Sequence, residues 1–100
     1  MKIEKVIGAG DLETERVELL RSGDGELTLA GWLIEDGEGN IFTFPQLTLY
    51  KGGAINLNTR TGQDTVVDLF WGLTSSIWQT GKTVYLYDAQ HQLQSRYTIP

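Results

Sequence analysis

The chain has 100 residues, no cysteine and a formal net charge of −5. This length holds one hydrophobic core and not two, and the missing cysteines exclude a disulfide-stapled scaffold. The acidic excess has the wrong sign for a module whose affinity comes from neutralising phosphates. We therefore expect one domain over residues 1–100, excised from or attached to a larger protein.

Charged residues interrupt the apolar stretches that could serve as targeting or membrane segments. The opening residues, MKIEKVIGAGDLETE, carry charges where a signal peptide needs an unbroken apolar run. No stretch approaches the roughly 20 apolar residues of a transmembrane helix. We expect no targeting segment and no membrane insertion, and the sequence leaves the compartment open.

The charge is unevenly distributed along the chain. Residues 1–40 hold ten acidic and four basic side chains, whereas residues 41–100 hold three acidic and four basic ones. The C-terminal part is therefore mildly positive, which leaves room there for weak contact with an anion.

Short alternations of apolar and polar residues predict strands. In RVELL (16–20), Val17 and Leu19 share one face, as in a half-buried strand. A helix over 11–20 is the weaker alternative for this part. The segment 27–36 alternates in the same way, with an interruption at Gly31 that is typical of a bulge or a close backbone approach.

The turn DGEGN (36–40) then predicts a hairpin to a strand that ends at Pro45. The remaining strands are predicted at 47–49, 55–57, 65–72, 82–89 and 93–99. In the last of them, Leu93 is expected to share a face with Ser95, Tyr97 and Ile99. This spacing of short strands indicates an all-β fold, an antiparallel sandwich or barrel.

Eight pieces of the sequence, in this order, resemble the lamin tail domain. They are ERVELL (15–20), LTLAGWLIED (27–36), FTFP (42–45), LYKGG (49–53), DLFWG (68–72), the tryptophan at 78, GKTVYLYDAQHQL (81–93) and RYT (96–98). Each piece is common by itself, but the ordered set covers nearly the whole chain. The resemblance implies an immunoglobulin-like antiparallel β-sandwich.

The resemblance also carries expectations about function. Lamin tail domains end the nuclear lamins, where they are implicated in contacts with chromatin, DNA and proteins. Similar bacterial modules are attached to hydrolases, nucleases or envelope proteins as tethers. This chain has no heptad segment and looks like a bacterial-type or stand-alone member. It departs from its relatives at Asp88 to His91, where they often have Asp-x-x-Gly, and its acidity weakens any transfer of DNA binding.

No catalytic arrangement is visible in the sequence. His91 is the only histidine and is expected to be an exposed turn residue. Ser75 and Ser76 lack a nucleophile elbow, and the adjacent Glu35 and Asp36 point to opposite faces of a strand. We therefore expect a noncatalytic chain that uses no cofactor.

Two loops invite a ligand-binding interpretation. In DGEGN, Asp36, Glu38 and Asn40 offer oxygens at alternate positions but lack the later bidentate acid of a calcium loop, so a hairpin turn is the preferred interpretation. GAGDLE has two glycines but no lysine and no strand-loop-helix context for phosphates. We predict no metal site and no nucleotide site.

The tyrosines of the segment 82–89 are the best candidates for partner binding. If Val84 and Leu86 face the core, Tyr85 and Tyr87 face outward. The candidate site is therefore the set Tyr85, Tyr87, Lys82 and Arg96, because aromatic rings beside cations stack on bases, sugars or partner side chains. Cross-strand packing that shields the sheet is the alternative role for the tyrosines, and sequence reasoning favours it.

Both tryptophans of DLFWGLTSSIWQTG (68–81) are expected to be structural. Alternation puts Trp71 on one face with Val67 and Leu69, and Trp78 occupies the second tryptophan position of the family. The predicted core residues are Val17, Leu19, Trp32, Phe44, Leu69, Trp71, Trp78, Leu86 and Tyr97.

Three hypotheses for function stay open. The first is a noncatalytic tether that binds a protein or a cell-envelope component. The second is weak nucleic-acid binding through Lys51, Arg60, Lys82 and Arg96, which the net charge disfavours. The third is a structural spacer in a multidomain hydrolase. Uncovered edge strands would also allow a dimer.

Overall fold

A computed structural model describes residues 1–100, which form ten β-strands and no helix. The strands are β1 (Lys2–Ile7), β2 (Arg16–Leu20), β3 (Leu27–Thr28), β4 (Leu33–Glu35), β5 (Ile41–Thr43), β6 (Thr48–Leu49), β7 (Ala54–Asn58), β8 (Asp68–Phe70), β9 (Thr83–Tyr87) and β10 (Leu93–Thr98). The all-β prediction is confirmed, and the helical alternative over 11–20 is wrong because β2 occupies its second half. The structure contains no helix that could span a membrane.

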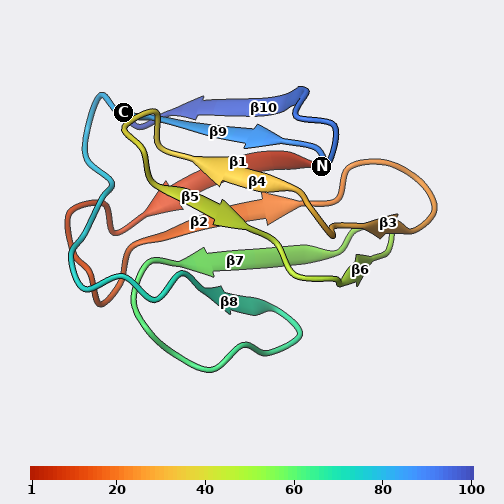
Figure 1. Cartoon of the computed structure of the whole chain (residues 1–100), viewed down its shortest axis with the longest axis horizontal. Helices are drawn as coiled ribbons and strands as arrows, with labels where there is room; N and C mark the ends of the chain where they lie inside the picture. The colour runs from red at the N-terminus through yellow and green to blue at the C-terminus, as the bar shows by residue number, and fades with distance from the viewer.

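Two four-stranded sheets form a sandwich (Figure 1). One sheet has the strand order β1-β2-β7-β8, the other has the order β10-β9-β4-β5, and β3 and β6 form a separate two-stranded ribbon. All neighbouring strands are antiparallel except β7 and β8, which run parallel. The polar loop between these two strands carries the chain back to the start of β7 before β8 begins, which explains this departure from a purely antiparallel sandwich.

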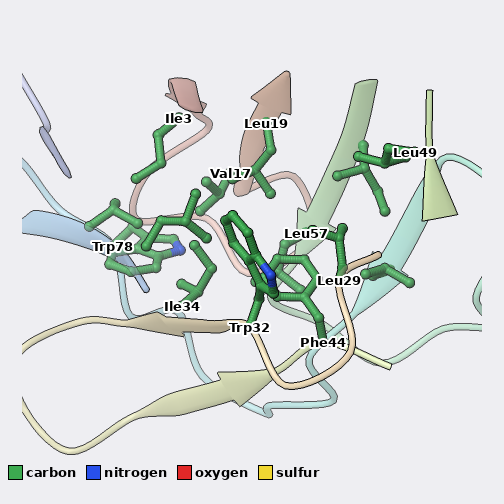
Figure 2. Packing of buried hydrophobic residues seen from close by; sticks show 14 of the residues in the cluster. Ile3, Val17, Leu19, Leu29, Trp32, Ile34, Phe44, Leu49, Leu57 and Trp78 are labelled. Carbon is green, nitrogen blue, oxygen red and sulfur yellow. The ribbon is translucent and has the colours of Figure 1, made fainter. Parts of the chain in front are cut away.

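The core lies between the two sheets and is shown in Figure 2. Seven of the nine expected core residues are buried in it: Val17, Leu19, Trp32, Phe44, Leu69, Trp78 and Leu86. Trp71 and Tyr97 are half-buried and pack against the same cluster. Alternation along each strand therefore identified the inward face correctly at these positions.

The segment 27–36 is two strands in different sheets rather than one interrupted strand. Gly31 has a φ of +84°, a conformation that favours glycine, and the turn there separates β3 from β4. A β-carbon at position 31 would lie 3.4 Å from the Cβ of Ala89, so the backbone also approaches a neighbouring loop closely. The sequence indicated a special glycine but not the change of sheet.

The first strand, β1, was not predicted from the sequence. It pairs with β2, and the register shifts between Ile3 and Lys5. This bulge breaks the alternation, so that the buried Ile3 and the half-buried Val6 are three residues apart instead of two. A strand with this spacing does not show the pattern by which strands are recognised.

A second bulge corrects the expected face of Leu93. Leu93 pairs with Tyr87, but Ser95 pairs with Leu86, so one extra residue lies between them on β10. Leu93 is 47% exposed and lies on the outer face with Tyr87, whereas Tyr97 faces inward.

Val67 does not share the buried face of Leu69, contrary to the expectation from alternation. Its side chain is 48% exposed. The residue precedes β8 in a turn held by Thr65, whose hydroxyl accepts hydrogen bonds from the N–H groups of Val67 and Asp68. Because the chain turns here, the alternation of the strand does not extend back to position 67.

Candidate interaction surface

The outer surface of the β10-β9-β4-β5 sheet carries both candidate tyrosines. Tyr85 lies between Arg96 on β10 and Glu35 on β4, in register with both. Tyr87 lies in the same way between Leu93 and Leu33. We call this surface the tyrosine face and define it by Leu33, Glu35, Ile41, Tyr85, Tyr87, His91, Leu93 and Arg96.

Aromatic rings run along β9 and into the following turn. The ring centroids of Tyr85 and Tyr87 are 6.5 Å apart with an interplanar angle of 25°. The imidazole of His91 stacks on Tyr87 at 4.5 Å. Two exposed aliphatic side chains, Ile41 at 51% and Leu93 at 47%, flank the rings. The result is a half-buried aromatic strip with apolar neighbours, which is the composition of many protein interfaces.

His91 is placed over the strip by the geometry of its turn. It is the only non-glycine residue with positive φ, at 60°. Asp88 holds this turn, because one carboxylate oxygen accepts the N–H groups of Gln90 and Gln92, both at 2.9 Å. His91 Nε2 lies 3.6 Å from a carboxylate oxygen of Glu35. The expectation of an exposed turn histidine is confirmed.

Arg96 is the exposed cation of this face. Its guanidinium has no carboxylate within ion-pair distance, unlike the lysines at positions 2, 5, 51 and 82. Because it lies directly beside Tyr85, it is available to a partner that approaches the tyrosine face.

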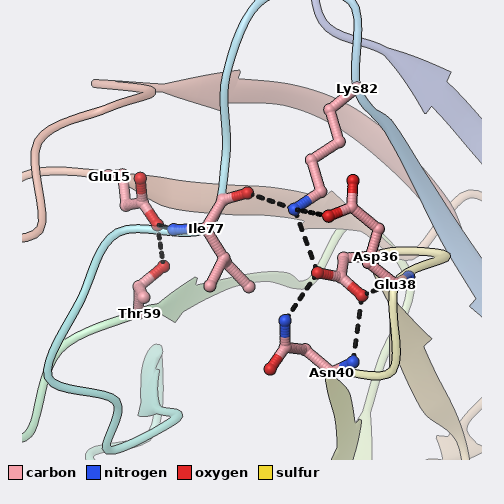
Figure 3. Close-up of polar contacts among 7 residues, drawn as sticks. All are labelled: Glu15, Asp36, Glu38, Asn40, Thr59, Ile77 and Lys82. Carbon is pink, nitrogen blue, oxygen red and sulfur yellow. Dashed lines mark hydrogen bonds and ion pairs between the residues drawn. The ribbon is translucent and has the colours of Figure 1, made fainter.

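Lys82 is not an exposed neighbour of the tyrosines, and its place in the predicted site is corrected. Its side chain is only 10% exposed, and its ammonium lies 3.0 Å from Asp36 and 3.6 Å from Glu38. The same ammonium donates a 2.6 Å hydrogen bond to the carbonyl oxygen of Ile77 (Figure 3). Lys82 directly precedes β9, and its ammonium joins the turn after β4 to the loop at Ile77.

The DGEGN turn joins β4 to β5 as predicted, and its carboxylate Asp36 faces inward. Burial by itself would raise the pKa of Asp36. Hydrogen bonds from the Asn40 side chain, the Glu38 N–H and Lys82 outweigh burial and lower the pKa from 3.8 to about 2. The oxygens of Asp36 are therefore used to hold the turn and to pair with Lys82.

Sequence reasoning missed a second buried carboxylate, Glu15. It is 1% exposed and accepts hydrogen bonds from the Thr59 hydroxyl at 2.6 Å and from the Ile77 N–H at 2.9 Å. Glu15 and Lys82 thus hold opposite ends of the Ile77 residue, one at its N–H and the other at its carbonyl, as Figure 3 shows. A glutamate at the start of an alternating strand gives no sign of this role, because its partners are 44 and 62 residues away.

The four basic residues of the nucleic-acid hypothesis do not share a surface. Lys51 lies in the turn before β7 and pairs with Asp24. Arg60 lies over the ring of Phe70 on β8. Lys82 is buried in its ion pairs, and Arg96 is on the tyrosine face. This placement provides no continuous positive strip along which a phosphate backbone would run.

No group of three or more His, Asp or Glu side chains is arranged to hold a metal ion. The two surface depressions of the chain lie away from the tyrosine face. One lies over β2 and β7 beside Lys5 and Glu18, and the other lies beside Leu12 and Arg60. The chemistry that the surface offers is therefore the stacking, apolar contact and single free guanidinium of the tyrosine face.

Comparison with known families agrees with this architecture. The family model described as Lamin Tail Domain matches residues 1–100, the whole of the chain. A comparison with curated proteins finds no match. The family match is therefore the finding that connects the fold with other proteins.

Proposed function

The chain belongs to the lamin tail domain family, and from this premise we propose that it acts as a noncatalytic module that docks a partner through the tyrosine face. Residues 1–100 serve as one unit in this function. The unit fixes the position of whatever it is attached to, relative to a partner protein or a component of the cell envelope.

The position of the two tyrosines is the observation that carries the proposal. Tyr85 and Tyr87 lie on β9, an inner strand of the sheet, yet they point outward. The neighbouring positions Ile41, Leu93 and Arg96 are exposed as well. Tyrosine and arginine are enriched among residues that contribute most to protein binding, and such residues lie near the centre of an interface.

The charges of the face fit a partner that is bound mainly by contact area. Glu35 lies beside His91, and Arg96 is the only lysine or arginine of this face and has no carboxylate partner. Docking therefore depends on the two rings and responds only modestly to salt, in contrast to binding that neutralises many phosphates.

Substitution of both tyrosines tests the proposal. A Tyr85→Ser, Tyr87→Ser variant should reduce by about tenfold or more the amount of partner that co-purifies with the domain from its native cells. Asn56→Ser is the matched control, because Asn56 is half-buried on the outer side of the other sheet. If the domain is only a spacer, the double substitution should reduce the amount of co-purified partner no more than Asn56→Ser does. Both variants must keep the wild-type melting temperature for this comparison.

A further inference from the structure

The strand β5 is an open edge of the sandwich. It pairs only with β4. The Phe44 N–H donates to the Trp32 carbonyl, and the Asn40 carbonyl accepts from the Asp36 N–H, so the even-numbered positions point their backbone groups towards β4. In an antiparallel pair the intervening residues point the other way. Ile41 and Thr43 therefore present their N–H and C=O groups outward, and no loop or side chain binds them.

The other edge strands of the two four-stranded sheets, β1, β10 and β8, make contacts beyond their pairing partners. β1 and β10 contact each other, and the Ile3 N–H donates to the Ser95 hydroxyl at 3.0 Å. The edge of β8 is capped by the preceding loop, because the Phe70 N–H donates to Asp64 and the Asp68 carbonyl accepts from the Thr65 N–H. Natural sheets cover their edges in these ways to prevent unwanted pairing, so the unbound backbone groups of β5 are a specific feature of this edge.

Two half-buried aromatic rings lie on the inner side of this open edge. The ring centroids of Phe42 and Trp71 are 5.7 Å apart, and both rings pack on the margin of the core rather than inside it. Gly72 follows Trp71 and has no side chain, and nothing lies within 4 Å of the position that a β-carbon would take there. An apolar side chain that lies against this part of the surface would cover the exposed parts of both rings.

We propose that β5 is a docking site for an extended segment of another polypeptide, which pairs with Ile41 and Thr43 and packs an apolar side chain on Phe42 and Trp71. The free groups are backbone N–H donors and C=O acceptors on alternate residues of a strand. Another extended backbone presents groups at the same spacing and can match all of them. The two outward residues offer up to four such hydrogen bonds. The added strand extends the β10-β9-β4-β5 sheet by one strand.

The charges around β5 indicate an occupant without acidic side chains. Residues 39–50 and 69–81 contain no charged side chain, and the nearest charged groups at the surface are the carboxylates of Glu35, which pairs with Ile41, and Glu38, which is exposed in the turn before β5. A second copy of this chain is a poorer match, because two molecules that each carry a net charge of −5 repel one another. The site goes beyond the proposed function, because it shares only Ile41 with the tyrosine face and uses neither tyrosine.

A proline at position 43 tests for backbone pairing. Thr43→Pro removes an N–H that points away from β4, so the pairing of β4 with β5 stays intact while one donor to the added strand is lost. Thr43→Ala is the matched control, since it keeps this N–H and changes only the side chain. The probe is a displayed library of random linear peptides of about ten residues, selected on the immobilised domain.

The expected result is enrichment of peptides with apolar residues at alternate positions, which bind Thr43→Pro about tenfold or more weakly than Thr43→Ala. Equal binding to the two variants, no enrichment, or enrichment of acidic or helical patterns would overturn the proposal. So would concentration-dependent dimers that Thr43→Pro abolishes, because the occupant would then be a second copy.

Hydrogen exchange of the unsubstituted domain gives a second reading if Thr43→Pro fails to fold. The amides of Ile41 and Thr43 should exchange rapidly in the free domain and become protected when a selected peptide binds. Rapid exchange of Ile41 and Thr43 in the presence of a bound peptide would place the peptide elsewhere, which would contradict the edge site and leave the proposed function standing.

Discussion

The ammonium group of Lys82 lies 3.0 Å from a carboxylate oxygen of Asp36 and almost entirely out of contact with water. Asp36 directly follows β4, and Lys82 directly precedes β9. The pair therefore joins the two central strands of one sheet at the end of β4 and the start of β9. The tyrosine face is carried by these strands. The ion pair therefore fixes the scaffold of the candidate surface rather than contacting a partner.

This pair predicts a loss of stability in acid. The pKa of Asp36 is lowered in the folded chain to about 2, from 3.8. A group with a lowered folded pKa stabilises the fold above its unfolded pKa, and this contribution is lost as the pH falls from 3.8 to about 2. The free energy of unfolding should fall by about 2 kcal/mol through this window.

Denaturant titrations at several pH values measure this change. In Asp36→Asn the loss between these pH values should be smaller by about the same amount, because the titrating carboxyl is gone. An Asp36→Asn variant with the full acid dependence of the wild type would show that other carboxylates cause it.

Removal of Glu15 should destabilise the domain without loss of any apolar contact in the core. Glu15→Ala leaves the Thr59 hydroxyl and the Ile77 N–H without their acceptor, and the cost is about 3 kcal/mol. Glu15→Gln keeps one acceptor oxygen for these two donors and should cost less. Equal melting temperatures of Glu15→Ala and the wild type would contradict this assignment.

Trp78 should matter for stability far more than the exposed Tyr50. Trp78 is 1% exposed in the core, and Trp78→Ala should lower the free energy of unfolding by about 3–5 kcal/mol. Trp71 is half-buried, so Trp71→Ala should cost less, and Tyr50→Ala should be close to neutral. A Trp78→Ala variant that kept its melting temperature and lost only partner binding would assign this tryptophan to a binding site.

The sequence predicted most of the fold because alternation records which face of a strand is buried. It predicted the outward direction of Tyr85 and Tyr87 for the same reason. It failed at β1 and at Leu93, where bulges interrupt the alternation, and at Val67, where a turn replaces the strand. Local patterns cannot report an irregularity that is defined by the partner strand.

The site was only partly predictable for a different reason. Lys82 and Asp36 are far apart in the sequence, and nothing local to either residue shows that the fold brings them together. The same holds for Glu15 and its partners. The local pattern therefore predicts an exposed lysine beside two outward tyrosines, whereas Lys82 is buried in an ion pair.

Position-specific photo-crosslinking tests the central proposal most directly. A photoreactive phenylalanine analogue is placed at Leu93, which is exposed on the tyrosine face, and in a separate variant at Ala54, which is exposed on β7 of the other sheet. Irradiation in the native cells should give one defined adduct from position 93 and none from position 54. The adduct should disappear when Tyr85→Ser is combined with the probe. Adducts formed equally from both positions, or unaffected by Tyr85→Ser, would contradict docking through the tyrosine face.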